Sequence, residues 1–254
     1  MKIASWNINS LRKRQERLLD WLAKEEPDVV CLQETKCSDD QFPELALSAA
    51  GYRCVFHGQK SYNGVAILSR NELRERQAAL CDESEDPQAR VIAATINGVR
   101  IFSIYAPNGQ AVGSPAYDYK LNWYARLRDC LSKEENRELI VCGDFNVAPE
   151  DIDVHDPVLW GGAIMCSDRE RAAFRQLCDV GLIDTLRLHR QESGLFSWWD
   201  YRMLSFPKNR GLRIDAVLAN KSLAEKCTAA GIDREMRKGK EPSDHAPVWA
   251  EFNL

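Results

Sequence analysis

Short apolar runs recur along the chain, and most of them end in polar or charged residues. The runs are rich in β-branched side chains, which is typical of strands buried in a sheet. They cover residues 3–6, 29–32, 64–68, 99–104, 139–142, 212–218 and 247–252. We therefore predict a β-strand over each of these ranges.

Between the apolar runs, leucines and aromatic residues recur at helical spacing. Helices are predicted over residues 11–22, 117–131 and 167–180. In the first of them, one face holds four leucines and basic residues lie elsewhere; the leucines are Leu11, Leu18, Leu19 and Leu22. Ser167 is suited to cap the N-terminus of the third.

The order of these elements predicts the fold class. Strands outnumber helices and do not strictly alternate with them, which disfavours a Rossmann sheet. The pattern favours an α/β fold in which two β-sheets pack face to face with helices outside, a four-layer α/β sandwich. Residues 1–254 contain no repeat, low-complexity segment or long linker, so we expect a single domain.

Composition narrows the class of protein. The 254 residues are 44% hydrophobic, which is enough for a substantial core, and no apolar run approaches the roughly 20 residues that span a bilayer. The formal net charge of −4 argues against a protein that coats nucleic acid nonspecifically through a global positive field. It leaves room for an enzyme that meets phosphates in one cleft. We expect a soluble, cytoplasmic protein with no membrane partner.

The cysteines support this compartment. Their number, nine, is odd, and Cys31 and Cys142 lie inside apolar runs. No CxxC pair supplies a zinc spacing. The sequence therefore predicts buried free thiols in a reducing cytoplasm rather than a disulfide framework.

Polar side chains gather where the predicted strands end. They are Asn7, Glu34, Tyr105, Asp144, Asn146, Asp215, Asp244 and His245. A charge beside a core strand is costly unless it is paired or binds a metal. Any one of these residues alone could form a turn or a cap, but the whole set predicts a site at one edge of the sheets.

The residue types in this set suit attack on a phosphodiester. That reaction needs a deprotonated water, charge stabilisation at the phosphoryl oxygens and help for the leaving alkoxide. Carboxylates without a cysteine cluster favour a hard cation such as Mg²⁺, with Mn²⁺ as an alternative. Amide, phenol and imidazole groups can donate hydrogen bonds to phosphate oxygens.

The ordered motifs resemble those of the exonuclease III family of abasic-site endonucleases and 3′-exonucleases, within the endonuclease/exonuclease/phosphatase superfamily. The resemblance runs from near the first residue to near the last. Its motifs are Trp6-Asn7, Gln33-Glu34-Thr35-Lys36, Tyr62-Asn63-Gly64, Tyr105-Ala106-Pro107-Asn108-Gly109, Gly143-Asp144-Phe145-Asn146, Gly211-Leu212-Arg213-Ile214-Asp215 and Ser243-Asp244-His245-Ala246-Pro247.

The resemblance implies a role for each of these positions. The implied metal ligands are Asn7, Glu34, Asp144, Asn146 and Asp244, with Glu34 as the foremost. Asp144 activates the water or handles the leaving-group proton, and Asn146 orients the nucleophile. The other implied catalytic residues are Tyr105, which contacts the phosphate, and His245 with its partner Asp215, which polarise it.

An aromatic segment over residues 195–202 supplies a second clue. By resemblance, Phe196, Trp198 and Leu212 form an apolar pocket for a sugar that lacks its base, although such rings also suit a core. The implied partner is double-stranded DNA with abasic sites or 3′ ends, bound by a monomer. The implied reactions of base-excision repair are cleavage 5′ to abasic sites and removal of nucleotides and blocking groups from 3′ ends. Residues 149–169 are shorter and less basic than in the family, which leaves the balance between these activities open.

Two alternatives remain open from the sequence. One is a phosphodiesterase or phosphatase of the same superfamily that acts on another phosphate ester. The other is a catalytically inactive nucleic-acid-binding relative, which should have replaced some of Glu34, Asp144, Asp215 and His245. All four are present.

Overall fold

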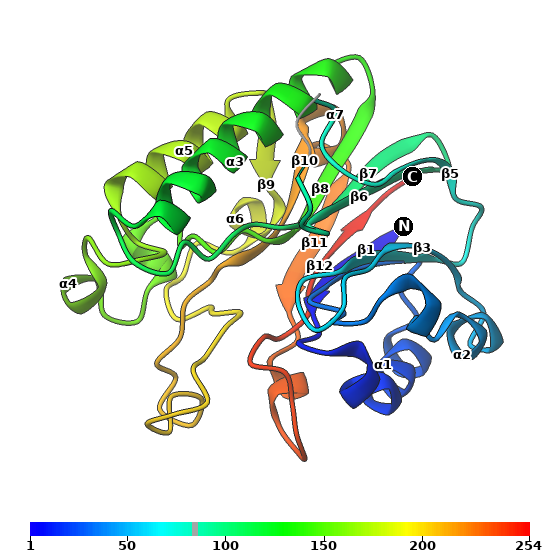
Figure 1. The fold of residues 1–254 in the computed structure, drawn as a ribbon, viewed down its shortest axis with the longest axis horizontal. Coiled ribbons are helices and arrows are strands. Elements are labelled where there is room, and N and C mark those ends of the chain that lie inside the picture. The colour runs from blue at the N-terminus through cyan, green and yellow to red at the C-terminus, as the bar shows by residue number, and fades with distance from the viewer. Residues whose placement is uncertain (83–85) are drawn as a thin grey trace.

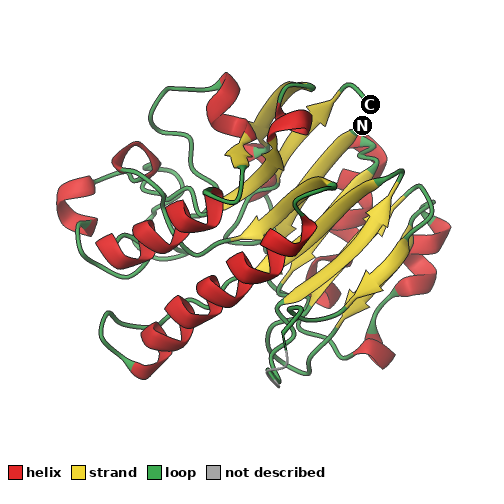
Figure 2. Ribbon diagram, turned by 90° about the horizontal axis from the view of Figure 1, so that it is seen from above, coloured by secondary structure: helices red, strands yellow, loops and turns green. Residues whose placement is uncertain are grey.

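Two β-sheets stack face to face between layers of helices in the computed structural model, which describes residues 1–82 and 86–254 (Figures 1 and 2). The first sheet has the order β11 (Cys227–Ile232), β12 (Val248–Phe252), β1 (Lys2–Asn7), β2 (Val29–Gln33), β4 (Val65–Ser69) and β3 (Arg53–His57). The second has the order β5 (Arg74–Gln77), β6 (Val91–Ile96), β7 (Val99–Tyr105), β8 (Glu138–Asp144), β10 (Asp215–Asn220) and β9 (Leu182–Asp184). The predicted α/β sandwich is confirmed.

Helices cover the outer face of each sheet. The α-helices are α1 (Leu11–Glu25), α2 (Glu44–Ala49), α3 (Pro115–Leu131), α4 (Pro157–Trp160), α5 (Asp168–Cys178), α6 (Thr185–His189) and α7 (Lys221–Ala224). Short 3₁₀ turns are η1 (Asp39–Gln41), η2 (Ser132–Glu134), η3 (Asp151–Asp153) and η4 (Arg234–Arg237). Helices α1 and α2 pack on the first sheet, and α3 and α5 pack on the second.

The alternation of side chains along each strand builds three apolar layers. On β1, Ile3 points into the core between the sheets, whereas Ala4 and Trp6 face α1. On β8, Ile140 points inward and Val141 faces α3. Successive side chains of a strand point to opposite faces, and because both faces of these strands are covered, both sets of side chains are apolar.

The strands that the apolar runs do not predict are mostly the edges of the sheets. They are β3, β5, β6, β9 and β11, of which all but β6 are edge strands. An edge strand has a partner on one side only and stays partly exposed, so its hydrophobic pattern is weak. The run 212–218 was predicted as one strand, but β10 begins only at Asp215. Leu212 instead forms isolated bridges with Val154 and Trp198.

Helix termini follow the predicted capping chemistry. The Ser167 side chain accepts a hydrogen bond from the backbone N–H of Glu170, and the Glu170 carboxylate accepts one from the backbone N–H of Ser167, which forms a capping box. At the start of helix α3, the Ser114 side chain accepts a hydrogen bond from the backbone N–H of Tyr117, and Pro115 lies in the first turn. Among the described residues, no helix combines the length and apolar composition needed to cross a membrane.

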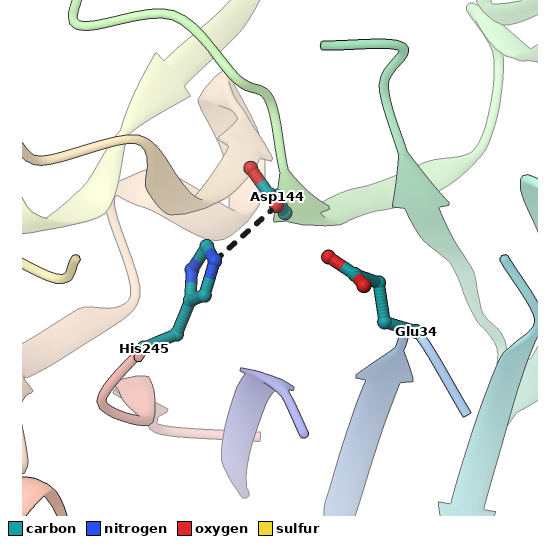
Figure 3. A group of neighbouring side chains, drawn as sticks. All are labelled: Glu34, Asp144 and His245. Carbon is teal, nitrogen blue, oxygen red and sulfur yellow. Dashed lines mark ion pairs between the residues drawn. The ribbon is translucent and has the colours of Figure 1, made fainter. Parts of the chain in front are cut away.

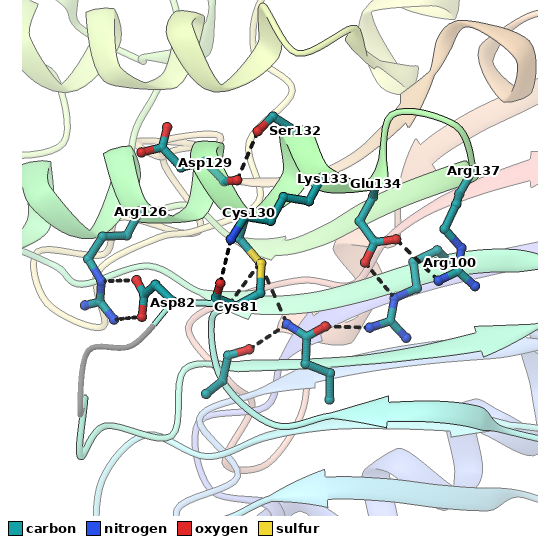
Figure 4. Close-up of a disulfide and its surroundings, with 12 residues drawn as sticks. Cys81, Asp82, Arg100, Arg126, Asp129, Cys130, Ser132, Lys133, Glu134 and Arg137 are labelled. Atoms are coloured by element: carbon teal, nitrogen blue, oxygen red, sulfur yellow. Dashed lines mark hydrogen bonds and ion pairs between the residues drawn. A yellow bond between two sulfur atoms is a disulfide. The ribbon is translucent and has the colours of Figure 1, made fainter.

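The prediction that all cysteines are free thiols is wrong at one pair. Cys81 and Cys130 form a disulfide that joins the segment between β5 and β6 to α3 (Figure 4). Their Cα atoms lie 5.3 Å apart although 49 positions separate them in sequence, so only the tertiary fold brings them together. The other seven cysteines are free, and four of them are buried.

Reduction of this disulfide should lower the free energy of unfolding by about 4 kcal/mol, because the bond closes a loop of about 50 residues in the unfolded chain. Urea unfolding with and without reductant measures the change, and Cys81→Ala/Cys130→Ala should match the reduced protein. Thiol titration of the denatured, unreduced protein should find seven reactive groups. Nine reactive thiols would contradict the assignment.

Candidate active site

Strand pairing brings the polar residues together at one end of both sheets. Strands β7 and β8 are parallel, and their register places Tyr105 opposite Asp144. Strand β10 runs antiparallel to β8, so its first residue, Asp215, also lies opposite Asp144. In the other sheet, the parallel pair β1 and β2 places Asn7 beside Gln33, immediately before Glu34.

Glu34, Asp144 and His245 form the centre of this cluster (Figure 3). Each offers one ligand atom, and these atoms lie within 4.8 Å of one another. His245 comes from the loop before β12, and its Nε2 lies 3.7 Å from Asp144 Oδ2. Its other ring nitrogen, Nδ1, lies 2.8 Å from Asp215 Oδ2. The cluster therefore draws its side chains from both sheets.

The charge state of His245 follows from its two carboxylate neighbours. Burial alone would lower the pKa of His245, but Asp215 and Asp144 together raise it to about 10. The ring is therefore an imidazolium at neutral pH. Its Nδ1–H donates to Asp215, and its Nε2–H faces the centre of the site.

Asp144 is buried among other charges. Burial, together with Asp215 and Glu34, raises the pKa of Asp144 to about 7, although His245 and a hydrogen bond from Asn7 oppose this rise. A carboxylate in this position takes up a proton easily and also releases one easily near neutral pH. A bound cation would favour the ionised form.

Asn7 links the two central carboxylates. Its Nδ2 donates to Glu34 Oε1 and to Asp144 Oδ2, both at 2.9 Å. Its Oδ1 accepts a bond from the backbone N–H of Asn9. The amide nitrogen, rather than the oxygen, thus faces the cluster, and Asn7 would have to rotate its amide to act as a metal ligand.

Asn146 and Asp244 lie at the margins of the cluster. Asn146 is buried, its Nδ2 donates to the Ala106 carbonyl and its Oδ1 accepts from Asn108. Asp244 accepts bonds from Asn9 Nδ2 at 2.8 Å and from Trp198 Nε1 at 3.1 Å. Burial opposes ionisation of Asp244, but His245 and these two donors hold its pKa below the usual value.

Tyr105 lies beside the two central carboxylates and retains its proton. Burial, together with Glu34 and Asp144, raises the pKa of its phenol well above the usual value. The Arg90 guanidinium lies 4.7 Å from the centre of the Tyr105 ring. The phenol can therefore donate a hydrogen bond to an anion at the site.

Two of the three residues of the predicted sugar pocket belong to the core, and they lie in different apolar clusters. Leu212 packs with Trp198, whereas Phe196 packs with Trp199. Phe196 and Leu212 are buried, whereas Trp198 is partly exposed. Trp160 of α4 packs edge-on against Trp198, with their ring centres 6.5 Å apart. The segment 149–169 thus covers part of the apolar surface formed by Trp198 and Leu212, and Trp198 is the accessible residue of the two.

Several side chains at the site were not predicted. Lys36 makes an ion pair with Glu34 at 2.7 Å and also donates to Asn9. Asn9 then reaches Asp244. Lys36 belongs to the motif Gln33-Glu34-Thr35-Lys36, and Asn9 lies two positions after Asn7. Neither spacing specifies which side chains come into contact.

The donors fit a hard divalent cation. Glu34 and Asp144 supply carboxylate oxygens, the ligands that Mg²⁺ prefers. With its pKa raised to about 10, His245 is protonated at neutral pH while no cation is bound, and in that form it can act as a cationic hydrogen-bond donor. Metal binding through the two carboxylates would compete with the Lys36 ion pair and with the Asn7 amide.

Asp215→Asn should lower the pKa of His245, because burial then acts without its main opposing charge. Titration of the imidazole by NMR measures this pKa, with the exposed Asp20→Asn as control. The raised pKa means that protonated His245 stabilises the fold below about pH 6.5, and that this stabilisation is lost as the pH rises toward about 10. An unchanged His245 pKa in Asp215→Asn would contradict the assigned pair.

Comparison with known proteins adds an independent observation. The family model described as the endonuclease/exonuclease/phosphatase family matches residues 4–245. The chain is 37% identical to "Exodeoxyribonuclease III" of Haemophilus influenzae over 99% of this chain and 100% of that protein. It is also similar to the structure of the 3′ phosphatase NExo (D146N) from Neisseria bound to product DNA hairpin, with a TM-score of 0.98, 44% identity and full coverage of both chains. An AP endonuclease from Archaeoglobus fulgidus gives a TM-score of 0.94 at 36% identity, again with full coverage of both chains. The chain therefore belongs to the endonuclease/exonuclease/phosphatase family.

Proposed function

We propose that this protein is a Mg²⁺-dependent DNA phosphodiesterase of exonuclease III type that acts at abasic sites or 3′ ends during DNA repair. The observation that carries the proposal is the cluster of Glu34 and Asp144 beside the imidazolium of His245. Two carboxylates can hold a hard cation, and a buried cationic donor can bind a phosphate oxygen. Acidic and cationic groups converge within one small volume.

The side chains divide the chemistry of hydrolysis between them. His245, oriented and charged by Asp215, donates a hydrogen bond to the scissile phosphate. Tyr105 donates a second, because its phenol stays protonated. Asp144, with a pKa near 7, exchanges a proton with the attacking water or with the leaving oxygen. Asn146 orients the nucleophile beside it.

Glu34 and Asp144 would hold the cation, with Asn7, Asn146 and Asp244 as further candidate ligands. When bound, Mg²⁺ would neutralise charge on the phosphoryl oxygens, and Mn²⁺ suits the same oxygen donors. Lys36 would then move away from Glu34 or contact the phosphate itself.

DNA is the substrate that the relatives' descriptions support. They include exodeoxyribonucleases, a 3′ phosphatase bound to product DNA hairpin and AP endonucleases. Around the site, Arg12, Lys13 and Lys36 line an open pocket that also contains Asn9 and Tyr201. These cations give a local phosphate-binding surface on a chain whose net charge is negative.

The remaining parts of the proposal concern the state of the protein. We propose that residues 1–254 act as one catalytic domain, as a monomer and in the cytoplasm. The seven free cysteines support a reducing compartment, and the Cys81–Cys130 disulfide argues against it. Seven reactive thiols in the denatured, unreduced protein would confirm the disulfide, and nine would show that every cysteine is free.

Glu34→Gln should lower turnover by at least about a hundredfold, the usual scale for loss of a key electrostatic group in an active site. A neutral amide keeps the size of the side chain but cannot replace its charge toward the cation. Hydrolysis of labelled DNA and calorimetric titration with Mg²⁺ measure both effects, with the exposed Glu16→Gln as control. Full activity of the unaltered protein in excess chelator would refute the metal dependence.

Trp198→Ala should change substrate preference, because an apolar wall discriminates by shape, typically by about 1–3 kcal/mol. Cleavage is compared on three duplexes, which carry an abasic site, a 3′ phosphate or an unmodified 3′ end. The fully buried Trp199 provides the matched control: Trp199→Ala should lower the melting temperature and leave the preference unchanged. Parallel loss of activity on all three duplexes in Trp198→Ala would assign Trp198 to the core. Failure of the unaltered protein to cleave any of them would refute the proposed function.

A further inference from the structure

A buried ion pair lies beside the active-site loops, and neither of its residues has a role in the proposed phosphodiester hydrolysis. Lys120 of α3 and Glu170 of α5 have no exposed side-chain surface, and their Nζ and Oε1 atoms are 2.5 Å apart. Burial of two opposite charges seldom stabilises a fold more than apolar residues of the same volume would. Stability alone therefore gives no reason for this pair at this place.

The ammonium of Lys120 places two of its three hydrogen bonds on backbone carbonyls of the active-site loops. Nζ donates to the backbone carbonyl of Asn146 at 2.8 Å and to that of Asn108 at 3.1 Å. The third donor is directed at Glu170. An ammonium has three donors, so each of them has a partner.

These two carbonyls belong to residues whose side chains are locked to each other. Asn108 Nδ2 donates to Asn146 Oδ1 at 3.1 Å, and Asn146 Nδ2 donates to the Ala106 carbonyl at 2.9 Å. The backbone N–H of Asn146 donates to Asp144 Oδ1. Asn146 has a φ of 51°, a left-handed conformation that needs support from its surroundings. The position of the Asn146 backbone thus decides where its amide and the Asp144 carboxylate lie.

Glu170 extends the same junction to a third loop. Its Oε1 accepts from the backbone N–H of Met165 at 3.0 Å, and its Oε2 accepts from the N–H and the hydroxyl of Ser167. The Met165 carbonyl in turn accepts a bond from the backbone N–H of Ala148, next to the Asn146 loop. One ion pair therefore ties together the loops 106–109, 145–148 and 163–167.

The packing around Lys120 leaves little freedom. A Cβ atom on Gly109 would lie 3.0 Å from Lys120 Cδ and 3.1 Å from Ile164 Cδ1. Gly109 also has a φ of +88°, so the loop needs glycine for both reasons. The aliphatic part of Lys120 is thus enclosed by the loops that its ammonium holds.

We propose that Lys120 and Glu170 are positioning residues, which fix the Asn146 and Asn108 loops in the geometry that phosphodiester hydrolysis requires. This inference rests on the proposed function, because Asn146 must take part in the reaction for its placement to matter. A displacement of about 1 Å in such a group can reduce the rate by about a hundredfold. The pair acts through Asn146 and contacts neither substrate nor cation.

Lys120→Met tests the proposal by removing the ammonium while retaining an unbranched side chain. The double variant Lys120→Met/Glu170→Gln removes both charges and leaves no buried charge without a partner. It therefore allows activity to be measured if Lys120→Met alone destabilises the fold. The control is Arg100→Met, which removes a buried cation from the opposite end of β7. There Arg100 donates to the Glu75 carbonyl and to Gln77, remote from Tyr105. Turnover, KM, melting temperature and backbone amide exchange are measured for each variant.

Both Lys120 variants should lose kcat by about tenfold to a hundredfold with a much smaller change in KM. Hydrogen exchange of the Asn146 and Ala148 backbone amides should be faster in these variants. Arg100→Met should retain the wild-type kcat and the slow exchange of these two amides, even where its melting temperature falls by a comparable amount. In an Asn146→Ala background, Lys120→Met should cost little further turnover, because both changes disable the same group.

Several outcomes would overturn the proposal. They are wild-type kcat in Lys120→Met/Glu170→Gln, equal loss of kcat in Arg100→Met, full additivity with Asn146→Ala, and failure of both Lys120 variants to fold. Absence of Mg²⁺-dependent DNA hydrolysis in the unaltered protein would instead refute the proposed function. The two failures are therefore distinguishable.

Discussion

The ion pair between His245 and Asp215 determines the charge of the imidazole and, through it, affects the pKa of Asp144. Without Asp215, burial would lower the pKa of the imidazole, and His245 would supply less positive charge opposite the Asp144 carboxylate. With it, an imidazolium lies 3.7 Å from Asp144 and opposes the rise in the pKa of that carboxyl group. The pair also joins the two sheets, because Asp215 begins β10 in one sheet and His245 precedes β12 in the other.

The distance between the sheets therefore enters the chemistry directly. Glu34 comes from the first sheet and Asp144 from the second, and Asn7 donates to both carboxylates at 2.9 Å. Below them, Gln33 donates to Ser103 across the same interface. The inner apolar layer holds the sheets at a fixed separation because close-packed interiors resist small displacements. The core thus determines whether the carboxylates lie close enough to share a cation.

Loops at the site lack the regular hydrogen bonds of a sheet, and buried charges supply the missing partners. Lys120 satisfies the Asn146 and Asn108 carbonyls, and Glu170 satisfies donors of the loop before α5. Arg213 is another buried charge, and it pairs with the carboxylates of Asp153 in η3 and of Asp184 at the end of β9. Such charges are stable only because each one is paired. Buried ion pairs therefore support the loops that surround the active site.

The sequence by itself determined the architecture, because strand and helix periodicities depend on local spacing and on which faces are covered. Among the residues that it predicts for the site, Glu34 and Asp144 follow apolar runs, Asp215 lies within the run 212–218 and His245 precedes the run 247–252. The structure brings these four side chains together. Edge strands escaped prediction because half of their surface faces water, and the Cys81–Cys130 bond escaped because its partners are 49 positions apart. Only the tertiary structure decided that Asn7 turns its nitrogen to the carboxylates, that Phe196 and Leu212 are buried, and that Lys120 reaches Asn146. Those outcomes depend on side-chain contacts between distant segments, which no spacing along the chain encodes.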